Sequence, residues 1–323
     1  MLDSAVRALV AGGAGFIGSH LCARLLADGN EVISVDNLVT GDRRNLAGVG
    51  ANPRFRAVEH DLIESLPSLP KVDAVFQLAS PASPPGYMRK PVETALVNSL
   101  GTKNLLDLAK ANGARFLMAS TSEAYGDPLV HPQPETYWGN VDPIGLRACY
   151  DEGKRFGEML TSVYWRTHGV DARIIRIFNC YGPHSDPEDG RIVPTFIRQA
   201  LLGEDLPVHG SGDQTRSLCY VSDLVEGMLR VMFHAGTTGE VFNLGNPDER
   251  SVQELAQVIN RLCGGRSKIV HVDVPERVGD PQRRCPDITK AKSTLHWEPR
   301  VGLEDGLGQT IAWFRERLGI VAA

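Results

Sequence analysis

The sequence has no long apolar run and no strong excess of either charge. Its hydrophobic stretches are far shorter than the roughly 20 residues that cross a bilayer, so we expect no membrane partner. The 34 basic and 39 acidic residues leave a formal net charge of −5, which argues against nucleic acid as a partner. With 42% hydrophobic and 23% charged residues, the 323-residue chain has the composition of a globular protein with room for two lobes.

The sequence also lacks paired or clustered cysteines. No C-x-x-C motif occurs and no histidines gather beside a cysteine, so we predict neither a disulfide framework nor a metal site. Reduced thiols are typical of the cytoplasm, and the start Met1–Ser4 lacks the basic region of a signal peptide, so we expect a cytoplasmic protein. The six cysteines are Cys22, Cys149, Cys180, Cys219, Cys263 and Cys285.

Short apolar runs alternate with segments of helical periodicity through the first 180 residues. Such alternation predicts an α/β fold with a doubly wound parallel sheet, whose ligands bind at the carboxyl ends of the strands. The predicted strands are Ala5–Val10, Glu31–Val35, Phe55–Glu59, Ala74–Leu78, Arg115–Ala119 and Ala172–Ile177. The predicted helices are Phe16–Ala27, Pro91–Lys110 and Cys149–His168.

A glycine-rich segment, Gly12–Gly18, lies where the first strand turns into the first helix. Asp36 closes the second strand about twenty residues later, and this combination is the fingerprint of a dinucleotide site. The glycines let the backbone approach a pyrophosphate, while the Asp36 carboxylate accepts from ribose hydroxyls and repels a 2′-phosphate. We therefore predict NAD rather than NADP as the cofactor, although Arg43 and Arg44 nearby would favour a 2′-phosphate.

Other polar residues follow the predicted strands at the same edge of the sheet. Asp61 is placed to accept from an adenine amine, and Ser80, Thr121 and Asn179 each follow a strand. The prolines of Ala79–Gly86 predict a loop that is neither helix nor central strand. The residues assigned to the cofactor are Gly12, Gly15, Phe16, Ile17, Gly18, Asp36, Asn37, Asp61, Leu62, Leu78, Ala79 and Ser80, together with Tyr150 and Lys154.

Tyr150 and Lys154 stand four residues apart and therefore share one face of a predicted helix. An ammonium beside a phenol favours the phenolate, so we expect Lys154 to lower the pKa of Tyr150 from about 10. Such a tyrosine can take a proton from an alcohol while a hydride leaves the same carbon. The pair is a candidate catalytic centre, although a Tyr-x-x-x-Lys spacing also occurs by chance in helices without that role.

After Asn179 the alternation of strands and helices becomes irregular. Gly182-Pro183 and the acidic segment Asp186–Gly190 indicate a boundary, so we divide the chain into a dinucleotide-binding domain, 1–179, and a smaller α/β substrate-binding lobe, 180–323. A strand near 241–245 is predicted to return to the main sheet. Further predictions are a helix over Ile192–Leu202, a turn at Gly210–Asp213, a helix that a Ser251–Glu254 capping box opens and that ends near Cys263, and a terminal helix over Leu303–Arg317.

These segments resemble the extended short-chain dehydrogenase/reductases of the NAD-dependent epimerase/dehydratase family, which modify nucleotide sugars on a Rossmann-type fold. The resemblance covers nearly the whole chain and rests on Gly12–Gly18, Thr121, Tyr150 with Lys154, Arg176–Asn179 and Gly212–Arg216. More narrowly, the chain is similar to the UDP-glucuronate decarboxylases, the enzymes that make UDP-xylose. The stretches that carry this likeness are Leu78–Pro85, Ser120–Glu123, Asp127-Pro128, His131-Pro132, Asp280–Asp287 and, above all, Pro143–Arg155.

The resemblance implies a reaction with no net change of redox state. NAD would oxidise C4 of the hexuronate, the resulting 4-ketone would let the C5 carboxylate leave as CO2, and the hydride would return to give UDP-xylose. The resemblance further implies that Tyr150 removes the C4 proton with Lys154 beside it, and that Thr121 holds the C4 oxygen. Ser122 and Glu123 would manage the carboxylate or the protonation at C5, and the division of these roles stays open.

The resemblance also implies cationic contacts for a substrate that carries a diphosphate and a carboxylate. Arg216 and Asn179 match diphosphate contacts, whereas Arg284 matches an arginine near the sugar, where a guanidinium suits carboxylate or phosphate equally. The chain departs from the family at Cys285, where a lysine is usual, and at His184, where an arginine is usual, and both changes remove positive charge near the expected pocket. The implied substrate-binding residues are Pro85, Asn179, Arg191, Arg216, Tyr220 and Arg284.

Other functions stay open on the same scaffold, namely 4-epimerisation and 4,6-dehydration of a nucleotide sugar. Dehydratases of this kind carry Asp-Glu after the threonine, whereas this chain has Ser122-Glu123 and so lacks the acid. A non-catalytic NAD-binding protein is a third alternative, but such proteins typically lose the tyrosine or the lysine that this chain keeps. By analogy with the family we expect a homodimer in which the helices Pro91–Lys110 and Cys149–His168 pair with their copies.

Overall fold

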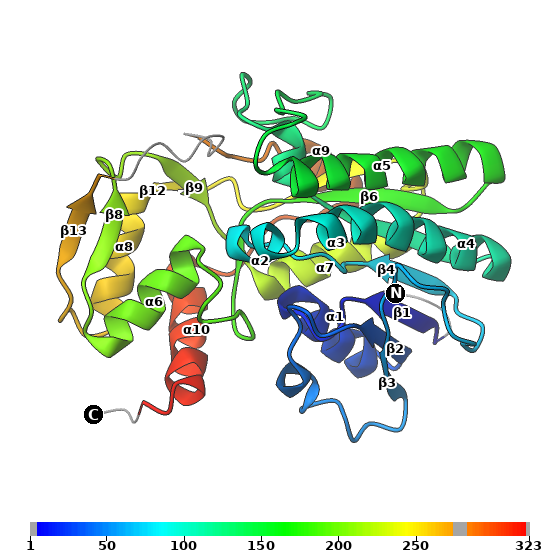
Figure 1. The fold of residues 1–323 in the computed structure, drawn as a ribbon, viewed down its shortest axis with the longest axis horizontal. Helices are drawn as coiled ribbons and strands as arrows, with labels where there is room; N and C mark the ends of the chain where they lie inside the picture. The colour runs from blue at the N-terminus through cyan, green and yellow to red at the C-terminus, as the bar shows by residue number, and fades with distance from the viewer. Residues whose placement is uncertain (1–4, 274–282, 321–323) are drawn as a thin grey trace.

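The structure is a computed structural model that describes residues 5–273 and 283–320. The chain start, Met1–Ser4, and Asp280–Gln282 of the run that resembles the decarboxylases lie outside the described residues. Figure 1 shows a central sheet with helices on both faces and a smaller lobe beside it, which holds the C-terminal helix. Within the described ranges, the structure contains no helix that is both long enough and apolar enough to span a membrane.

In the described part of the chain, seven strands form one parallel sheet in the order β3–β2–β1–β4–β5–β6–β11 (Figure 1). The order reverses between β1 and β4, so a crevice for ligands is expected at the carboxyl ends of these two strands. The predicted α/β fold with a doubly wound parallel sheet is confirmed, and a strand at 241–244 does join the main sheet beside β6. The strands are β1 (Arg7–Ala11), β2 (Glu31–Asp36), β3 (Phe55–Glu59), β4 (Ala74–Gln77), β5 (Arg115–Thr121), β6 (Ala172–Ile177) and β11 (Val241–Leu244).

The inner strands β1, β4 and β5 are mostly apolar and buried on both faces because helices cover both faces of the sheet. On β1, Ala8 and Val10 enter one core while Leu9 and Ala11 enter the other. One face packs against α1 (Phe16–Ala27), α7 (Val221–Phe233) and α9 (Thr289–Leu295). The opposite face packs against α4 (Thr102–Asn112) and α5 (Ala148–His168), and α3 (Pro91–Leu96) packs on α5.

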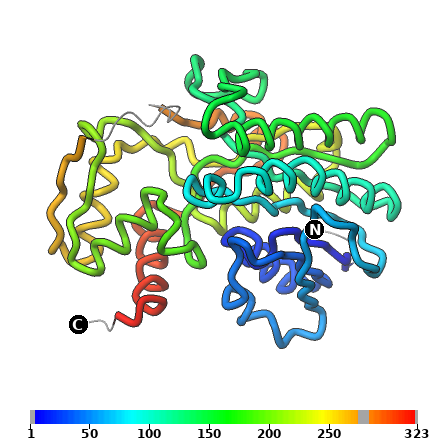
Figure 2. The backbone as a smooth tube through the Cα atoms, viewed as in Figure 1, coloured from blue at the N-terminus to red at the C-terminus, as the bar shows by residue number. Residues whose placement is uncertain are grey.

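The smaller lobe is built mostly from chain after residue 180. Its core is continuous with the core on the α1–α7 face of the sheet, and the tube in Figure 2 shows chain of the second half running in both parts. The predicted capping box at the start of α8 is present, since Glu254 N donates to Ser251 Oγ at 3.1 Å and Ser251 N donates to Glu254 Oε2 at 2.8 Å. The lobe contains α6 (Ile192–Leu202), α8 (Val252–Leu262) and α10 (Leu303–Arg317), with the strand pairs β8 (Leu206–His209) and β13 (Ile269–Val272), β9 (Thr215–Ser217) and β12 (Glu249–Ser251), and β7 (Cys180–Tyr181) and β10 (Cys219–Tyr220).

Two local predictions were wrong. The segment Ala79–Gly86 is not loop throughout, because a short helix, α2 (Pro84–Arg89), begins inside it. A proline in the first turn removes an N–H that has no partner there anyway, and Ser83 caps the helix by accepting from Gly86 N at 3.3 Å. The predicted helix Pro91–Lys110 is interrupted by a π-helical turn, Val97–Gly101, and ends at Asn112.

Candidate active site

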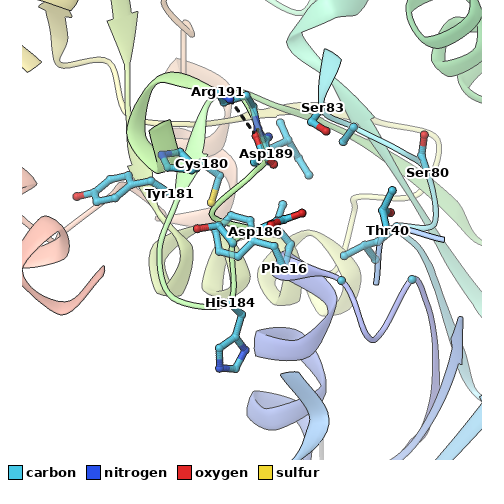
Figure 3. Close-up of a pocket in the computed structure, with 18 of the residues that line it drawn as sticks. Phe16, Thr40, Ser80, Ser83, Cys180, Tyr181, His184, Asp186, Asp189 and Arg191 are labelled. Carbon is cyan, nitrogen blue, oxygen red and sulfur yellow. Dashed lines mark hydrogen bonds and ion pairs between the residues drawn. The ribbon is translucent and has the colours of Figure 1, made fainter. Parts of the chain in front are cut away.

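Two adjoining cavities of about 740 and 270 Å³ open at the carboxyl ends of the sheet strands. They share Gly12, Gly15, Leu78 and Ser80 in their walls. Figure 3 shows that the wall of the larger cavity is formed from both halves of the chain, with Phe16 and Ser80 on one side and Tyr181 and Arg191 on the other. The crevice predicted at this edge of the sheet is therefore a real cavity.

The glycine-rich turn has a shape that only glycine allows at key positions. Gly12 has a φ of +79°, and a Cβ there would lie 2.8 Å from the backbone nitrogen of Ala79. A Cβ on Gly18 would collide with the carbonyl oxygen of Gly12. Gly15 and the first turn of α1 line the larger cavity, so helix N–H groups and bare backbone are available to a pyrophosphate.

The smaller cavity has the donor and acceptor groups that an adenosine needs. Asp36 ends β2, and its carboxylate accepts from Ala14 N at 2.9 Å and Leu38 N at 2.8 Å, which fixes its orientation. Burial raises the pKa of Asp36, and these two hydrogen bonds oppose the rise. Asp61 accepts from Asn37 Nδ2 at 3.1 Å. The predicted cofactor residues Asp36, Asn37, Asp61, Leu62 and Ala79 all line this cavity.

Tyr150 and Lys154 lie on α5, and both line the larger cavity. The Tyr150 ring stacks on Tyr87 of α2, with ring centroids 5.1 Å apart. Lys154 Nζ donates to the carbonyl of Ala119 at 2.9 Å and lies 5.9 Å from the Tyr150 ring centroid. The predicted proximity on one helix face is thus present.

The predicted effect of Lys154 on the pKa of Tyr150 was wrong for this structure. Burial raises the pKa of Tyr150 to about 12, against the opposing effect of a hydrogen bond with the Thr121 side chain. Burial also lowers the pKa of Lys154 to about 7, so the ammonium is only partly charged at neutral pH. Desolvation therefore dominates the pKa of both groups.

Thr121 is the last residue of β5, and the sheet edge places it beside Tyr150. Its Oγ1 accepts from Glu123 N at 3.2 Å, which starts a single turn of 3-10 helix over Ser122–Tyr125. Ser122 is buried and lines the same cavity as Thr121 and Glu123. The strand end and the turn together hold three candidate catalytic residues against one wall.

Glu123 is held by two guanidinium groups. Arg284 donates to both carboxylate oxygens, with its second nitrogen 3.0 Å from Oε2, and Arg147 donates to Oε2 as well. Burial would raise the pKa of Glu123, but the two arginines hold it below its usual value. We call Glu123, Arg147 and Arg284 the carboxylate clamp.

Two members of this neighbourhood were not predicted. Arg147 immediately precedes α5 and lines the larger cavity, but no role was assigned to it although it lies within the Pro143–Arg155 run. Asp151 lies one turn later, with Oδ2 3.7 Å from Arg147 Nε. Burial and the charge of Glu123 raise the pKa of Asp151 to about 7. The one available signal was the concentration of charged residues around Tyr150.

The predicted substrate-binding residues separate into two groups. Asn179, Arg191, Arg216 and Arg284 line the larger cavity, and Arg191 makes a two-point ion pair with Asp189 at 2.5 and 2.7 Å (Figure 3). Among these, Arg216 also donates to the carbonyl of Thr215 at 2.7 Å. The four side chains bring several permanent charges to one wall.

Pro85 and Tyr220 line neither of the two cavities, so their contact with substrate stays a prediction. A Cβ on Gly190 would lie 2.9 Å from Pro85, which therefore packs behind the cavity wall. Tyr220 is buried in the smaller lobe, where its hydroxyl donates to Gln309 at 3.0 Å. Neither outcome was visible in the sequence because both depend on contacts between distant segments.

The two departures from the family lie in different surroundings. His184 lines the larger cavity and stacks on His20 with ring centroids 4.7 Å apart. Burial, and then the charges of His20 and Arg317, lower the pKa of His184 to about 4, so its imidazole is neutral at pH 7. Arg317 of α10 lines the same cavity and pairs with Asp42 at 2.5 Å. Cys285 is buried and lines neither cavity.

A doubly wound sheet with a glycine-rich turn, an acidic residue at the end of β2 and a Tyr-Lys pair on α5 defines a dinucleotide-dependent enzyme. The model of the NAD dependent epimerase/dehydratase family matches residues 8–245. The chain belongs to this family, and NAD is its cofactor.

Relatives and solved structures agree with this assignment. The chain is 52% identical over 312 residues to UDP-glucuronic acid decarboxylase 1 of Xenopus tropicalis, covering 97% of this chain and 73% of the relative. It is 52% identical over 320 residues to UDP-glucuronic acid decarboxylase 5 of Arabidopsis thaliana, covering 98% and 92%. The structure matches a UDP-glucose 4-epimerase of Thermotoga maritima with UDP-glucose (TM-score 0.88, 33% identity, 97% and 99% covered) and a dTDP-glucose 4,6-dehydratase of Streptomyces venezuelae with NAD bound (TM-score 0.85, 33% identity, 97% and 98% covered).

Proposed function

We propose that the protein is a UDP-glucuronate decarboxylase, which converts UDP-glucuronate to UDP-xylose and CO2 with no net redox change. The close similarity to relatives of that name supports the proposal. The structural observation that carries it is the carboxylate clamp beside Tyr150 and Thr121 in the larger cavity.

The clamp brings a surplus of positive charge to the sugar end of the cavity. Arg147 and Arg284 contribute two positive charges and Glu123 one negative charge, which leaves one positive charge. Asp151 is only partly ionised at pH 7, because its pKa is about 7. A sugar that carries a carboxylate would compensate this surplus through charge-assisted hydrogen bonds, whereas a neutral hexose would not.

The proposed chemistry distributes proton transfer and charge among the residues of one wall. Bound NAD would accept the hydride from C4 of the sugar, would carry a positive charge in its oxidised form, and would return the same hydride at the end of the reaction. Tyr150 exchanges the C4 hydroxyl proton, Thr121 orients the C4 oxygen, and Lys154 sits beside the phenol. Once C4 is a ketone, the bond to the neighbouring carboxylate breaks, CO2 leaves, and the electron pair enters the enolate until C5 is protonated.

The low pKa of Glu123 favours decarboxylation over 4,6-dehydration. Loss of the C6 hydroxyl needs a proton donor, and a carboxylate that two guanidinium groups keep ionised is a poor one. We infer that Glu123 anchors Arg147 and Arg284 for the substrate carboxylate. Ser122 lies in the same wall and stays a candidate for the protonation at C5.

The purified protein and UDP-glucuronate provide the decisive assay. We expect stoichiometric CO2 and UDP-xylose without consumption of added NAD. Release of no CO2, together with formation of UDP-galactose from UDP-glucose, would establish a 4-epimerase instead. Absence of turnover on both substrates while NAD still binds would favour the non-catalytic alternative.

We also propose a cytoplasmic homodimer with the two-lobe division 1–179 and 180–323. Each of the six cysteines, all in described segments, is free of a disulfide, as suits a reducing compartment. Helices α3 and α5 pack together, and with the π turn between α3 and α4 they expose large apolar side chains that a second copy could cover. These side chains are Val92, Leu96, Leu100, Phe156 and Met159.

Sedimentation at micromolar concentration tests the homodimer. Wild type should sediment as a dimer, and Phe156→Glu should shift it to monomer because a carboxylate would be buried in an apolar interface. Trp138→Glu changes an 87% exposed apolar residue on a different segment and should leave the dimer intact. A monomeric wild type contradicts the proposal.

A further inference from the structure

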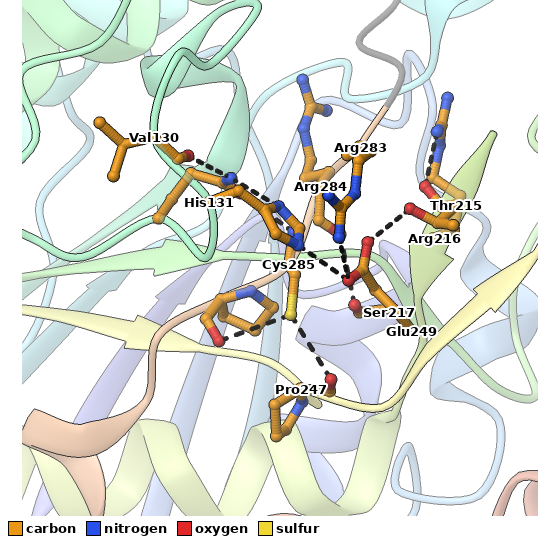
Figure 4. A network of polar contacts seen from close by, with 12 residues as sticks. Val130, His131, Thr215, Arg216, Ser217, Pro247, Glu249, Arg283, Arg284 and Cys285 are labelled. Atoms are coloured by element: carbon orange, nitrogen blue, oxygen red, sulfur yellow. Dashed lines mark hydrogen bonds and ion pairs between the residues drawn. The ribbon is translucent and has the colours of Figure 1, made fainter.

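A compact group of potential metal ligands lies next to the carboxylate clamp but outside both cavities (Figure 4). It consists of His131, Glu249 on β12, and Cys285, the residue that follows Arg284. Their ligand atoms all lie within 4.8 Å of one another, and His131 Nε2 is 2.8 Å from Glu249 Oε2. The spacing in sequence carries no metal motif, so the prediction of no metal site did not consider this grouping.

The three ligands are held in place by surrounding hydrogen bonds. Glu249 Oε1 accepts from Thr215 Oγ1 at 2.5 Å, which leaves Oε2 pointing at His131. The backbone of Cys285 donates to the side chain of Gln133 at 3.0 Å, and Gln133 is completely buried. Such partners orient the ligands of protein metal sites and strengthen metal binding.

We propose that His131, Glu249 and Cys285 form a binding site for Zn²⁺. One imidazole nitrogen, one carboxylate oxygen and one thiolate are a donor set that zinc accepts, and the soft sulfur disfavours Mg²⁺ and Ca²⁺. A tetrahedral zinc with ligand bonds of about 2.0–2.3 Å separates its ligand atoms by about 3.3–3.8 Å. The 2.8 Å contact between His131 and Glu249 must therefore widen, and any separation near 4.8 Å must shorten by about 1 Å. The side chains of His131 and Glu249 are 22% and 20% exposed, which gives them room to move and water access to a fourth position.

The protons and charges of the site balance. Zinc displaces the proton of Cys285 Sγ, which leaves to solvent as the Zn–S bond forms. His131 Nδ1 now accepts from Gln133 Nε2 over a long 3.4 Å contact, so Nε2 carries the ring proton. On zinc binding this proton moves to Nδ1, so the 2.8 Å hydrogen bond from His131 Nε2 to Glu249 and the long contact with Gln133 are both lost. The hydrogen bond from Cys285 Sγ to the carbonyl of Pro247 at 3.4 Å is lost as well, and the three bonds to zinc replace these contacts. Arg283, whose side chain is 61% exposed and 3.5 Å from Glu249, can turn into solvent at little cost.

Zinc at this site would restrain the segment that carries Arg284. Cys285 adjoins Arg284, and the carbonyl of Arg284 accepts from Ser217 Oγ at 3.2 Å. Zinc would tie this segment to β12 and to the loop that carries His131 (Figure 4). Zinc bound to Cys285 would therefore act as a tether behind the carboxylate clamp.

Titration of the purified NAD-bound protein, washed with chelator, tests the site. Zn²⁺ binding is measured by calorimetry, and Co²⁺ is used as a spectroscopic substitute that reports tetrahedral coordination and a thiolate-to-metal charge-transfer band. We expect one Zn²⁺ per chain and the charge-transfer band with Co²⁺. Cys285→Ser should weaken zinc binding by at least about 100-fold, beyond the effect of losing a supporting hydrogen bond, and should abolish the band.

Cys263→Ser is the matched control, because Cys263 and Cys285 are both 4% exposed and Cys263 belongs to no potential metal group among the described residues. It should bind Zn²⁺ as wild type does. His131→Gln provides a second test if Cys285→Ser does not fold by circular dichroism, and it should lose zinc affinity to a similar extent. Failure of wild type to bind one zinc, or wild-type affinity in Cys285→Ser or a folded His131→Gln, overturns the proposal.

Discussion

The carboxylate clamp makes a quantitative prediction for Glu123→Gln. The substitution keeps the shape of the side chain but removes the negative charge between Arg284 and Arg147. Removing one partner of a buried ion pair costs about 3–5 kcal/mol. The side chains of Glu123 and Arg147 are 16% and 19% exposed, so water reaches them and we expect the lower end, about 3 kcal/mol.

The partner substitution separates the ion pair from other effects. Arg284→Met leaves Glu123 paired with Arg147, and we expect a loss of about 2 kcal/mol, below the range for a fully orphaned charge. The double variant Glu123→Gln/Arg284→Met removes both charges of the Glu123–Arg284 pair, and Arg147 loses Glu123 just as it does in Glu123→Gln. The double variant should therefore be more stable than the sum of the single changes predicts, by about 1–3 kcal/mol.

Urea unfolding of the NAD-saturated variants, followed by circular dichroism, measures these free energies, provided the m-values agree. Glu226→Gln is a matched control, because Glu226 also accepts from two guanidinium groups, those of Arg24 and Arg230, and lines neither cavity. It should retain its CO2 release, whereas Glu123→Gln should lose CO2 release together with stability. Additive effects within about 0.5 kcal/mol would refute the clamp as an energetic unit.

Three further outcomes are expected. Tyr150→Phe keeps the ring stacked on Tyr87 but removes the hydroxyl that would transfer the proton. The rate of CO2 release should fall by about 10²- to 10⁴-fold, with an unchanged melting temperature. A loss of less than about tenfold would contradict a role of Tyr150 in proton transfer. The pKa of Lys154 falls from 10.5 to about 7 on folding, so unfolding takes up a proton between these pH values and the free energy of unfolding rises with pH there. Lys154→Met should flatten this rise when the melting temperature of NAD-free protein is measured against pH. Parallel curves for wild type and variant would contradict the prediction. Asp36→Ala should weaken NAD binding by about 10- to 100-fold, as expected for the loss of a charged hydrogen bond, and should reduce the preference for NAD over NADP. Fluorescence titration with both cofactors measures the two dissociation constants. An unchanged ratio of these constants would exclude Asp36 as the residue that selects NAD.

The sheet and the cofactor cradle were predictable because their signals are local. A glycine at φ +79°, an acidic residue at a strand end and short apolar strands each follow from a few adjacent residues. The secondary structure at 79–86 was predicted wrongly because proline is compatible with two local structures. Pro84 and Pro85 were predicted to exclude a helix, but in the first turn of α2 a proline costs no hydrogen bond.

The clamp and the acid–base properties were predictable only in part. Glu123 and Arg284 were candidates, but their contact joins residues 161 positions apart, and Arg147 had no partner that sequence spacing could suggest. The pKa of Tyr150 was predicted from one neighbour on the helix. In the fold, burial dominates and raises the pKa of Tyr150 to about 12, so the phenol is protonated at pH 7.

The residues proposed for oxidation at C4 and the arginine proposed to determine the product come from different parts of the chain. Strand β5 and helix α5, which pack together, supply Thr121, Tyr150 and Lys154, so in the proposed mechanism hydride and proton transfer at C4 depend on these two elements. Arg284 comes from the other half of the chain and reaches the same wall by pairing with Glu123. Because a β-keto acid loses CO2 only after oxidation at C4, the proposed mechanism has Arg284 act on a ketone that has already formed. Changes in the segment that carries Arg284 should therefore alter which product leaves the 4-ketone, while changes in β5 and α5 should stop every reaction on this scaffold.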